Sequence, residues 1–181
     1  GTFADAASEN HAEIAWRIMQ EPGFLAEFTT EQAQIMRYAI LHHNTPAVPG
    51  DAETTLLFYS RLLRDADKLD IWRVSLEYNI FHRLRNERFP ESYEVPDTLQ
   101  RRFREKKIIM LEEVDSFYDS ILFRLSWVYD LNFRHTLSEF LNRKIPERLL
   151  KKLPASGQLE LIKEEVKNYV LRKLEEGTEI N

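Results

Sequence analysis

Apolar residues recur along this chain at steps of three and four positions, which is the spacing of one face of an α-helix. A capping residue, Asn10 and later Thr29, is followed three positions on by Glu or Gln, which predicts helices over about 10–22 and 29–43. The same periodicity predicts further helical segments over about 53–88, with a break near 65–67, and over 97–107, 108–131, 138–143, 147–152 and 158–176. Because no alternating pattern typical of strands competes, the sequence predicts an all-α fold, a compact multi-helix bundle.

Composition narrows the class of protein. With 181 residues, 43% of them hydrophobic and 30% charged, we expect a single domain covering 1–181. No apolar run approaches the roughly 18 residues of a membrane span, so we expect no membrane partner. A net charge of -5 argues against polymeric nucleic acid as a partner. The chain has no cysteine, which fits a cytoplasmic location and leaves imidazole and carboxylate as the metal ligands.

Polar side chains interrupt the apolar faces of three predicted helices. His11 lies on such a face of the first helix, and His42 and His43 occupy the last turn of the second. Asp67 and Asp70 share an apolar stripe of the third. Burying imidazoles and carboxylates is costly unless each is paired or binds a cation. Their joint occurrence therefore predicts a shared metal site, in which one Asp ligates the cation while the other orients a ligand or a water.

Each of these features also has a simpler explanation. Arg or Lys can satisfy an Asp-x-x-Asp pair. His42 and His43 can be one core imidazole and one cation at a helix end, and His11 can pack beside its apolar neighbours. Asp65 points elsewhere on its helix, and we expect it to face solvent or to act as a cap.

Three runs, in their order along the chain, resemble the HD superfamily of metal-dependent phosphohydrolases: Asn-His-Ala-Glu at 10–13, His-His-Asn at 42–44 and Asp-Ala-Asp-Lys-Leu-Asp at 65–70. The resemblance spans roughly residues 1–80. It implies an HD-domain-like bundle in which 1–90 form the metal-site half, incomplete at its N-terminal end, and 91–181 form a helical extension packed on it. It also implies that metal-activated water hydrolyses a nucleotide or another small phosphate ester.

The resemblance implies roles for individual side chains. The metal ligands that it implies are His11, His42, His43 and Asp67. Asp67, Lys68 and Asp70 would form the catalytic group, with Asp70 orienting a ligand and Lys68 neutralising phosphate. The alternative for Lys68 is an exposed helix lysine. The cofactor would be one or two divalent ions of Mn, Fe, Co, Ni, Zn or Mg.

The His…His-Asp motif that defines the superfamily is absent from this sequence. Similar proteins carry it shortly before a segment like the Gly-Thr-Phe that begins this chain, so we expect residues upstream of Gly1 to supply it. For the chain from Gly1 onward we expect weak or no metal binding and no phosphohydrolase activity.

Two classes without enzymatic activity remain open. A catalytically degenerate signalling module would keep the bundle and lack the metal site. A protein-interaction domain would use the aromatic residues of 117–133 as a partner or homodimer surface, although their helical spacing favours packing in the core. The basic run at 101–107 has acidic neighbours, which favours a solvated helix face.

Overall fold

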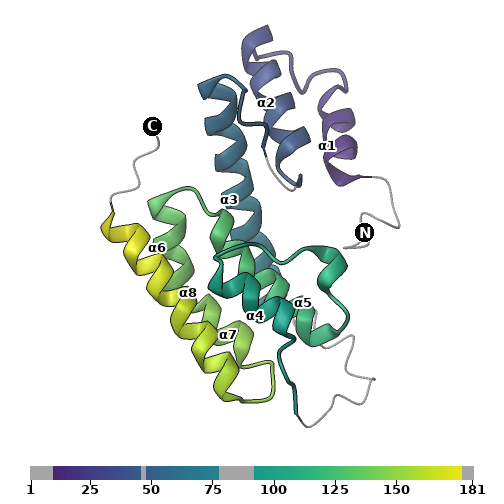
Figure 1. Cartoon of the computed structure of the whole chain (residues 1–181). Helices are drawn as coiled ribbons and strands as arrows, with labels where there is room; N and C mark the ends of the chain where they lie inside the picture. The colour runs from purple at the N-terminus through teal and green to yellow at the C-terminus, as the bar shows by residue number, and fades with distance from the viewer. Residues whose placement is uncertain (1–9, 46–47, 78–91, 177–181) are drawn as a thin grey trace. The chain divides into compact units, whose positions relative to one another are not determined.

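A computed structural model describes residues 10–45, 48–77 and 92–176 (Figure 1). These residues form eight α-helices and two 3₁₀ helices, and no strand occurs among them. The predicted all-α class is therefore confirmed. None of the described helices is long and apolar enough to cross a lipid bilayer.

The chain forms two compact units, residues 1–67 and 68–181. Helix α3 (Thr54–Glu77) begins in the first unit and ends in the second. Within the single domain that the sequence predicts, the resemblance implies two halves that meet at 90/91, a boundary within 78–91 that lies outside the described residues.

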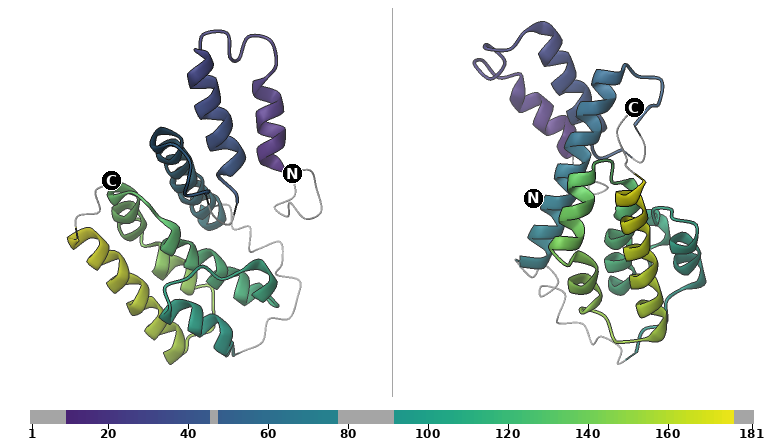
Figure 2. Two further views of the ribbon diagram at one scale, coloured as in Figure 1. Left: turned by 45° about the horizontal axis from the view of Figure 1, so that its top comes forward. Right: turned by 90° about the vertical axis from the view of Figure 1, so that its left-hand side faces the viewer.

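In the first unit, α1 (His11–Met19) packs beside α2 (Thr30–His42), as Figures 1 and 2 show. The start of α1 is capped by Asn10, whose Oδ1 accepts a hydrogen bond from the Ala12 N–H at 2.9 Å. The same Oδ1 accepts from Asn44 Nδ2 at 2.8 Å, so a residue that follows α2 holds the start of α1. The Arg37 guanidinium of α2 lies 5.8 Å from the centre of the Trp16 ring of α1, which adds a cation–π contact between the two helices.

The capping box predicted for the second helix is confirmed. Gln32 N–H donates to Thr29 Oγ1 at 3.2 Å, and Thr29 N–H donates to Gln32 Oε1 at 2.9 Å. These two bonds satisfy backbone donors that have no partner within the helix, and they fix the first turn of α2 at Thr30.

The second unit holds the large apolar core. Its helices are the end of α3, α4 (Asp97–Arg104), α5 (Phe117–Ser126), α6 (Arg134–Asn142), α7 (Ile145–Leu150) and α8 (Gly157–Glu175). Helix α8 packs against α4, α6 and α7 (Figure 2). Trp72 is fully buried there and donates from Nε1 to the Arg124 carbonyl at 3.0 Å. In the first unit, by contrast, the buried apolar side chains of the described residues are only Ala12 and Ala39.

The single helix predicted over 108–131 is wrong. The chain instead forms the 3₁₀ helices η3 (Leu111–Glu113) and η4 (Trp127–Asp130) on either side of α5. A new helix starts because Ser116 Oγ accepts from the Asp119 N–H at 3.0 Å while the Asp119 carboxylate accepts from the Ser116 N–H at 2.8 Å. A capping box inside an apolar run therefore ended the regular periodicity.

The predicted break near 65–67 is also wrong, because α3 is continuous through these positions. The core packing predicted for the aromatic stretch is confirmed for five of its residues. Tyr118 is buried, and the partly buried rings that pack against the same core are Phe117, Phe123, Trp127 and Tyr129.

Candidate functional site

Two of the predicted ligands meet in the first unit. His11, the first residue of α1, and His43, which directly follows the last residue of α2, face each other through their Nε2 atoms at 2.9 Å. Their rings meet edge to face, with centroids 4.9 Å apart. His11 is exposed and His43 is half-buried, so the pair is open to solvent on one side.

The hydrogen bonds of His43 fix which of its nitrogens carries the proton. Its Nδ1 lies 2.6 Å from the Ile40 carbonyl oxygen, and a carbonyl oxygen only accepts, so Nδ1 donates. The lone pair of a neutral His43 ring is then on Nε2 and points toward His11. In the absence of a cation, His11 Nε2 is the donor of the 2.9 Å bond.

This arrangement fits part of a metal site. A protein histidine that binds a metal usually donates its other ring N–H to a carbonyl or a carboxylate, as His43 does to Ile40. Two imidazole nitrogens on one tetrahedral Zn²⁺ ion lie roughly 3.3 Å apart, given bonds of about 2.0–2.1 Å. The observed 2.9 Å is about 0.4 Å short of that separation, and His11 would have to carry its proton on Nδ1 instead of Nε2 to bind an ion.

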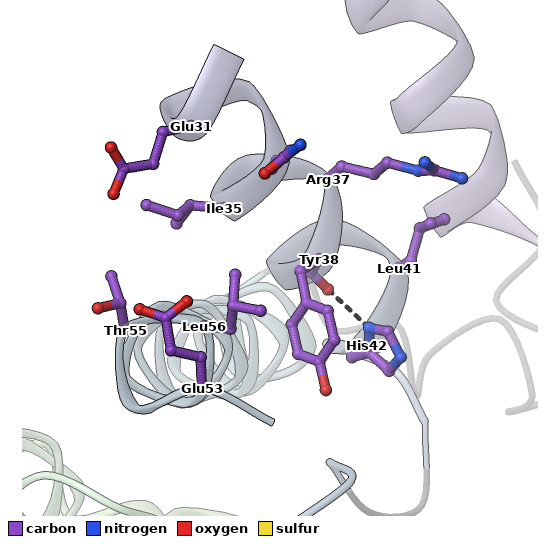
Figure 3. A pocket seen from close by; sticks show the side chains of 10 residues that line it. Glu31, Ile35, Arg37, Tyr38, Leu41, His42, Glu53, Thr55 and Leu56 are labelled. Carbon is purple, nitrogen blue, oxygen red and sulfur yellow. Dashed lines mark hydrogen bonds between the residues drawn. The ribbon is translucent and has the colours of Figure 1, made fainter. Parts of the chain in front are cut away.

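His42 faces a different region from His43. Its Nδ1 donates to the Tyr38 carbonyl at 2.8 Å, and its ring stacks on the Tyr38 ring at a centroid distance of 4.0 Å. Both side chains line a cavity of about 430 Å³ between α2 and the start of α3 (Figure 3). The carboxylates of Glu31 and Glu53 also line this cavity.

The acidic run at 65–70 is divided among different environments. Asp65, predicted to face solvent or to act as a cap, is 1% exposed, so that prediction is wrong. Asp67 is half-buried. Asp70 is exposed and accepts from Arg73 Nη2 at 2.6 Å. An arginine therefore satisfies this carboxylate, as in the simpler explanation of the Asp-x-x-Asp pair.

Lys68 is held in the second unit by an ion pair. Its Nζ lies 2.6 Å from Asp130 Oδ2, with side-chain exposures of 9% and 24%. Lys68 is therefore not the exposed helix lysine that was the alternative in the sequence. Its charge is compensated by a carboxylate of η4, a partner that the sequence did not indicate.

Among the described residues, no group of three or more His, Asp and Glu side chains is arranged to hold a metal ion. The structure thus brings His11 and His43 together and gives His42 and Asp70 other partners. The structure also shows backbone contacts of Arg64 that the sequence did not indicate. Arg64 is 4% exposed and binds the backbone at the end of α2.

No protein-family model matches the chain, and no curated protein or solved structure is significantly similar to it. A function for this chain must therefore be inferred from its own residues.

Proposed function

We propose that this chain is part of an HD-type metal-dependent phosphohydrolase that acts on a nucleotide or another small phosphate ester. The observation that carries the proposal is the His11–His43 pair, whose Nε2 atoms lie 2.9 Å apart. The pair coincides with two of the three runs that resemble the superfamily, at 10–13 and 42–44. The substrate class follows from the resemblance alone.

In this proposal His11 and His43 supply two nitrogen ligands. Asp67, which forms no three-residue metal group with them among the described residues, would supply an oxygen ligand only after a rearrangement. A divalent cation bound by them would polarise a phosphoryl oxygen and lower the pKa of a bound water. The hydrogen bond from His43 Nδ1 to the Ile40 carbonyl keeps the His43 lone pair on Nε2, where a ligand must present it.

The test is metal content and phosphatase activity of the protein expressed from its complete gene. We expect His43→Ala and Asp67→Ala each to lower activity by at least about 10-fold and to reduce bound metal. His135→Ala is the matched control, because His135 is an exposed histidine of α6 in the second unit. Full activity with unchanged metal content in either ligand variant would refute the assignment.

A second candidate is a non-catalytic interaction module, and one observation favours it. The first unit exposes large apolar side chains, each between 38% and 55% accessible: Ile18, Phe24, Phe28, Phe58, Tyr59 and Leu62. Light scattering over a concentration series separates the two candidates. A mass that doubles with concentration, without metal-dependent hydrolysis, favours the module, whereas metal-dependent hydrolysis at constant mass favours the enzyme.

We also propose a cytoplasmic location. The basis is the absence of cysteine, which is typical of proteins that do not depend on disulfides. Fractionation of cells that express the protein tests this proposal, and recovery in a secreted or membrane fraction would contradict it.

A further inference from the structure

Arg64 lies on α3 and contacts the end of α2. Its Nη1 donates to three backbone carbonyls, those of His42 at 3.1 Å, His43 at 3.1 Å and Thr45 at 2.7 Å. The side chain is almost fully buried, at 4% exposure. These contacts join residues that are 19 to 22 positions apart in sequence.

The end of a helix needs such a partner. The last carbonyls of an α-helix receive no hydrogen bond from within the helix, and they carry the negative end of its dipole. A guanidinium supplies both positive charge and several N–H donors in a fixed plane. Arg64 therefore fixes the backbone at the point where α2 ends and the chain turns away.

His43 projects from that backbone. Its carbonyl is held by Arg64, its Nδ1 is held by the Ile40 carbonyl at 2.6 Å, and its Nε2 meets His11 at 2.9 Å. A shift of the His43 backbone would lengthen the last two contacts together. The orientation of the His43 imidazole thus depends on Arg64, which holds the His43 backbone.

We propose that Arg64 is the positioning residue of the His11–His43 pair. It holds the main chain of His43 so that the ring keeps the tautomer with its Nε2 lone pair toward His11. The consequence for metal affinity rests on the proposed function, but the consequence for the tautomer does not.

The experiment records long-range ¹H–¹⁵N correlations of the imidazoles of the full chain near pH 8, together with Zn²⁺ binding by calorimetry. We expect wild-type His43 to show one tautomer, protonated on Nδ1. Arg64→Met should give a mixture of both tautomers, and whatever Zn²⁺ binding the wild type shows should weaken by about 10-fold or more. Arg61→Met, one helical turn earlier on α3, is the matched control and should change neither signal.

Arg64→Lys is a second test variant for the case in which Arg64→Met does not fold. It keeps the positive charge at the helix end, but its ammonium lies one atom closer to the main chain than Nη1 and is not part of a planar guanidinium. We expect circular dichroism of this variant to match the wild type and its His43 spectrum to lie between those of wild type and Arg64→Met. Wild-type tautomer and Zn²⁺ affinity within about 2-fold in folded Arg64→Met, or in Arg64→Lys if the Met variant does not fold, would overturn the proposal.

The two proposals fail in different ways. A wild-type chain that binds no Zn²⁺, combined with a changed His43 tautomer in Arg64→Met, would count against the metal site and support the role of Arg64. Zn²⁺ binding that is equal in the wild type and the folded variant would retain the metal site and refute the role of Arg64.

Discussion

Replacing Lys68 with Met tests whether this residue is held for stability or is available for phosphate. Lys68 Nζ and Asp130 Oδ2 lie 2.6 Å apart, and Lys68 is the more buried partner at 9% side-chain exposure against 24%. Lys68→Met keeps the length of the side chain and removes the charge. The Asp130 carboxylate then loses its ion pair with Lys68.

The expected loss of stability lies between two limits. Removing one partner of a fully buried ion pair costs about 3–5 kcal/mol, because the other charge is left uncompensated. Exposed pairs contribute about 0–1 kcal/mol. Asp130 keeps partial access to water, so we expect Lys68→Met to lower the free energy of unfolding by about 2–3 kcal/mol.

The assay is urea unfolding of the full chain, followed by circular dichroism. With a slope near 2 kcal/mol per molar urea, the midpoint should fall by about 1–1.5 M. Asp130→Asn should recover part of the loss in the double variant, giving a coupling energy of about 1–2 kcal/mol. Lys107→Met is the matched control, because the Lys107–Glu105 pair is exposed at 61% and 42%, and it should change stability by less than about 0.5 kcal/mol.

A stability loss for Lys68→Met no larger than that for Lys107→Met, with no coupling to Asp130, would refute this reasoning. It would leave Lys68 available for the phosphate-binding role that the resemblance implies. A large coupling would mean that loss of phosphatase activity in a Lys68 variant must be corrected for unfolding before any catalytic role is assigned.

Two further predictions concern the second unit. Burial, a 2.5 Å hydrogen bond to Asp119 and the charge of that carboxylate raise the pKa of Tyr93 above its ordinary 10.0. The folded chain therefore keeps this proton above about pH 10 where the unfolded chain loses it, so stability should fall with rising pH by up to about 1.4 kcal/mol per pH unit. Urea unfolding between about pH 9 and about pH 11 should show a smaller fall in Tyr93→Phe, and equal slopes would contradict the assignment. Trp72→Ala empties a fully buried site beside Phe140 and should cost about 3–5 kcal/mol in the same assay, with a loss below about 1 kcal/mol showing that the core refills.

Helical spacing predicted much of the local structure, because local structure depends on residues that are neighbours in sequence. The start of α2 was predicted from Thr29 and Gln32, and both side-chain bonds are present. The same spacing failed at Ser116, where a polar residue inside an apolar run begins a new helix. It also failed at Asp65, since a helical face can be read from spacing but the burial of that face depends on what packs against it.

In the candidate site, too, the sequence predicts helical faces but not which residues pack against them. Periodicity places His11 and His43 on apolar faces, but it does not say that their Nε2 atoms meet at 2.9 Å, because that distance depends on how α1 packs on α2. The burial of Arg64 was harder to predict, since a lone arginine in a charged run is usually a surface residue. Its role became visible only when three carbonyls from the end of another helix were found around one guanidinium nitrogen. A residue that positions others through their backbone leaves no pattern in the side-chain sequence, because the groups that it binds are present at every position of the chain.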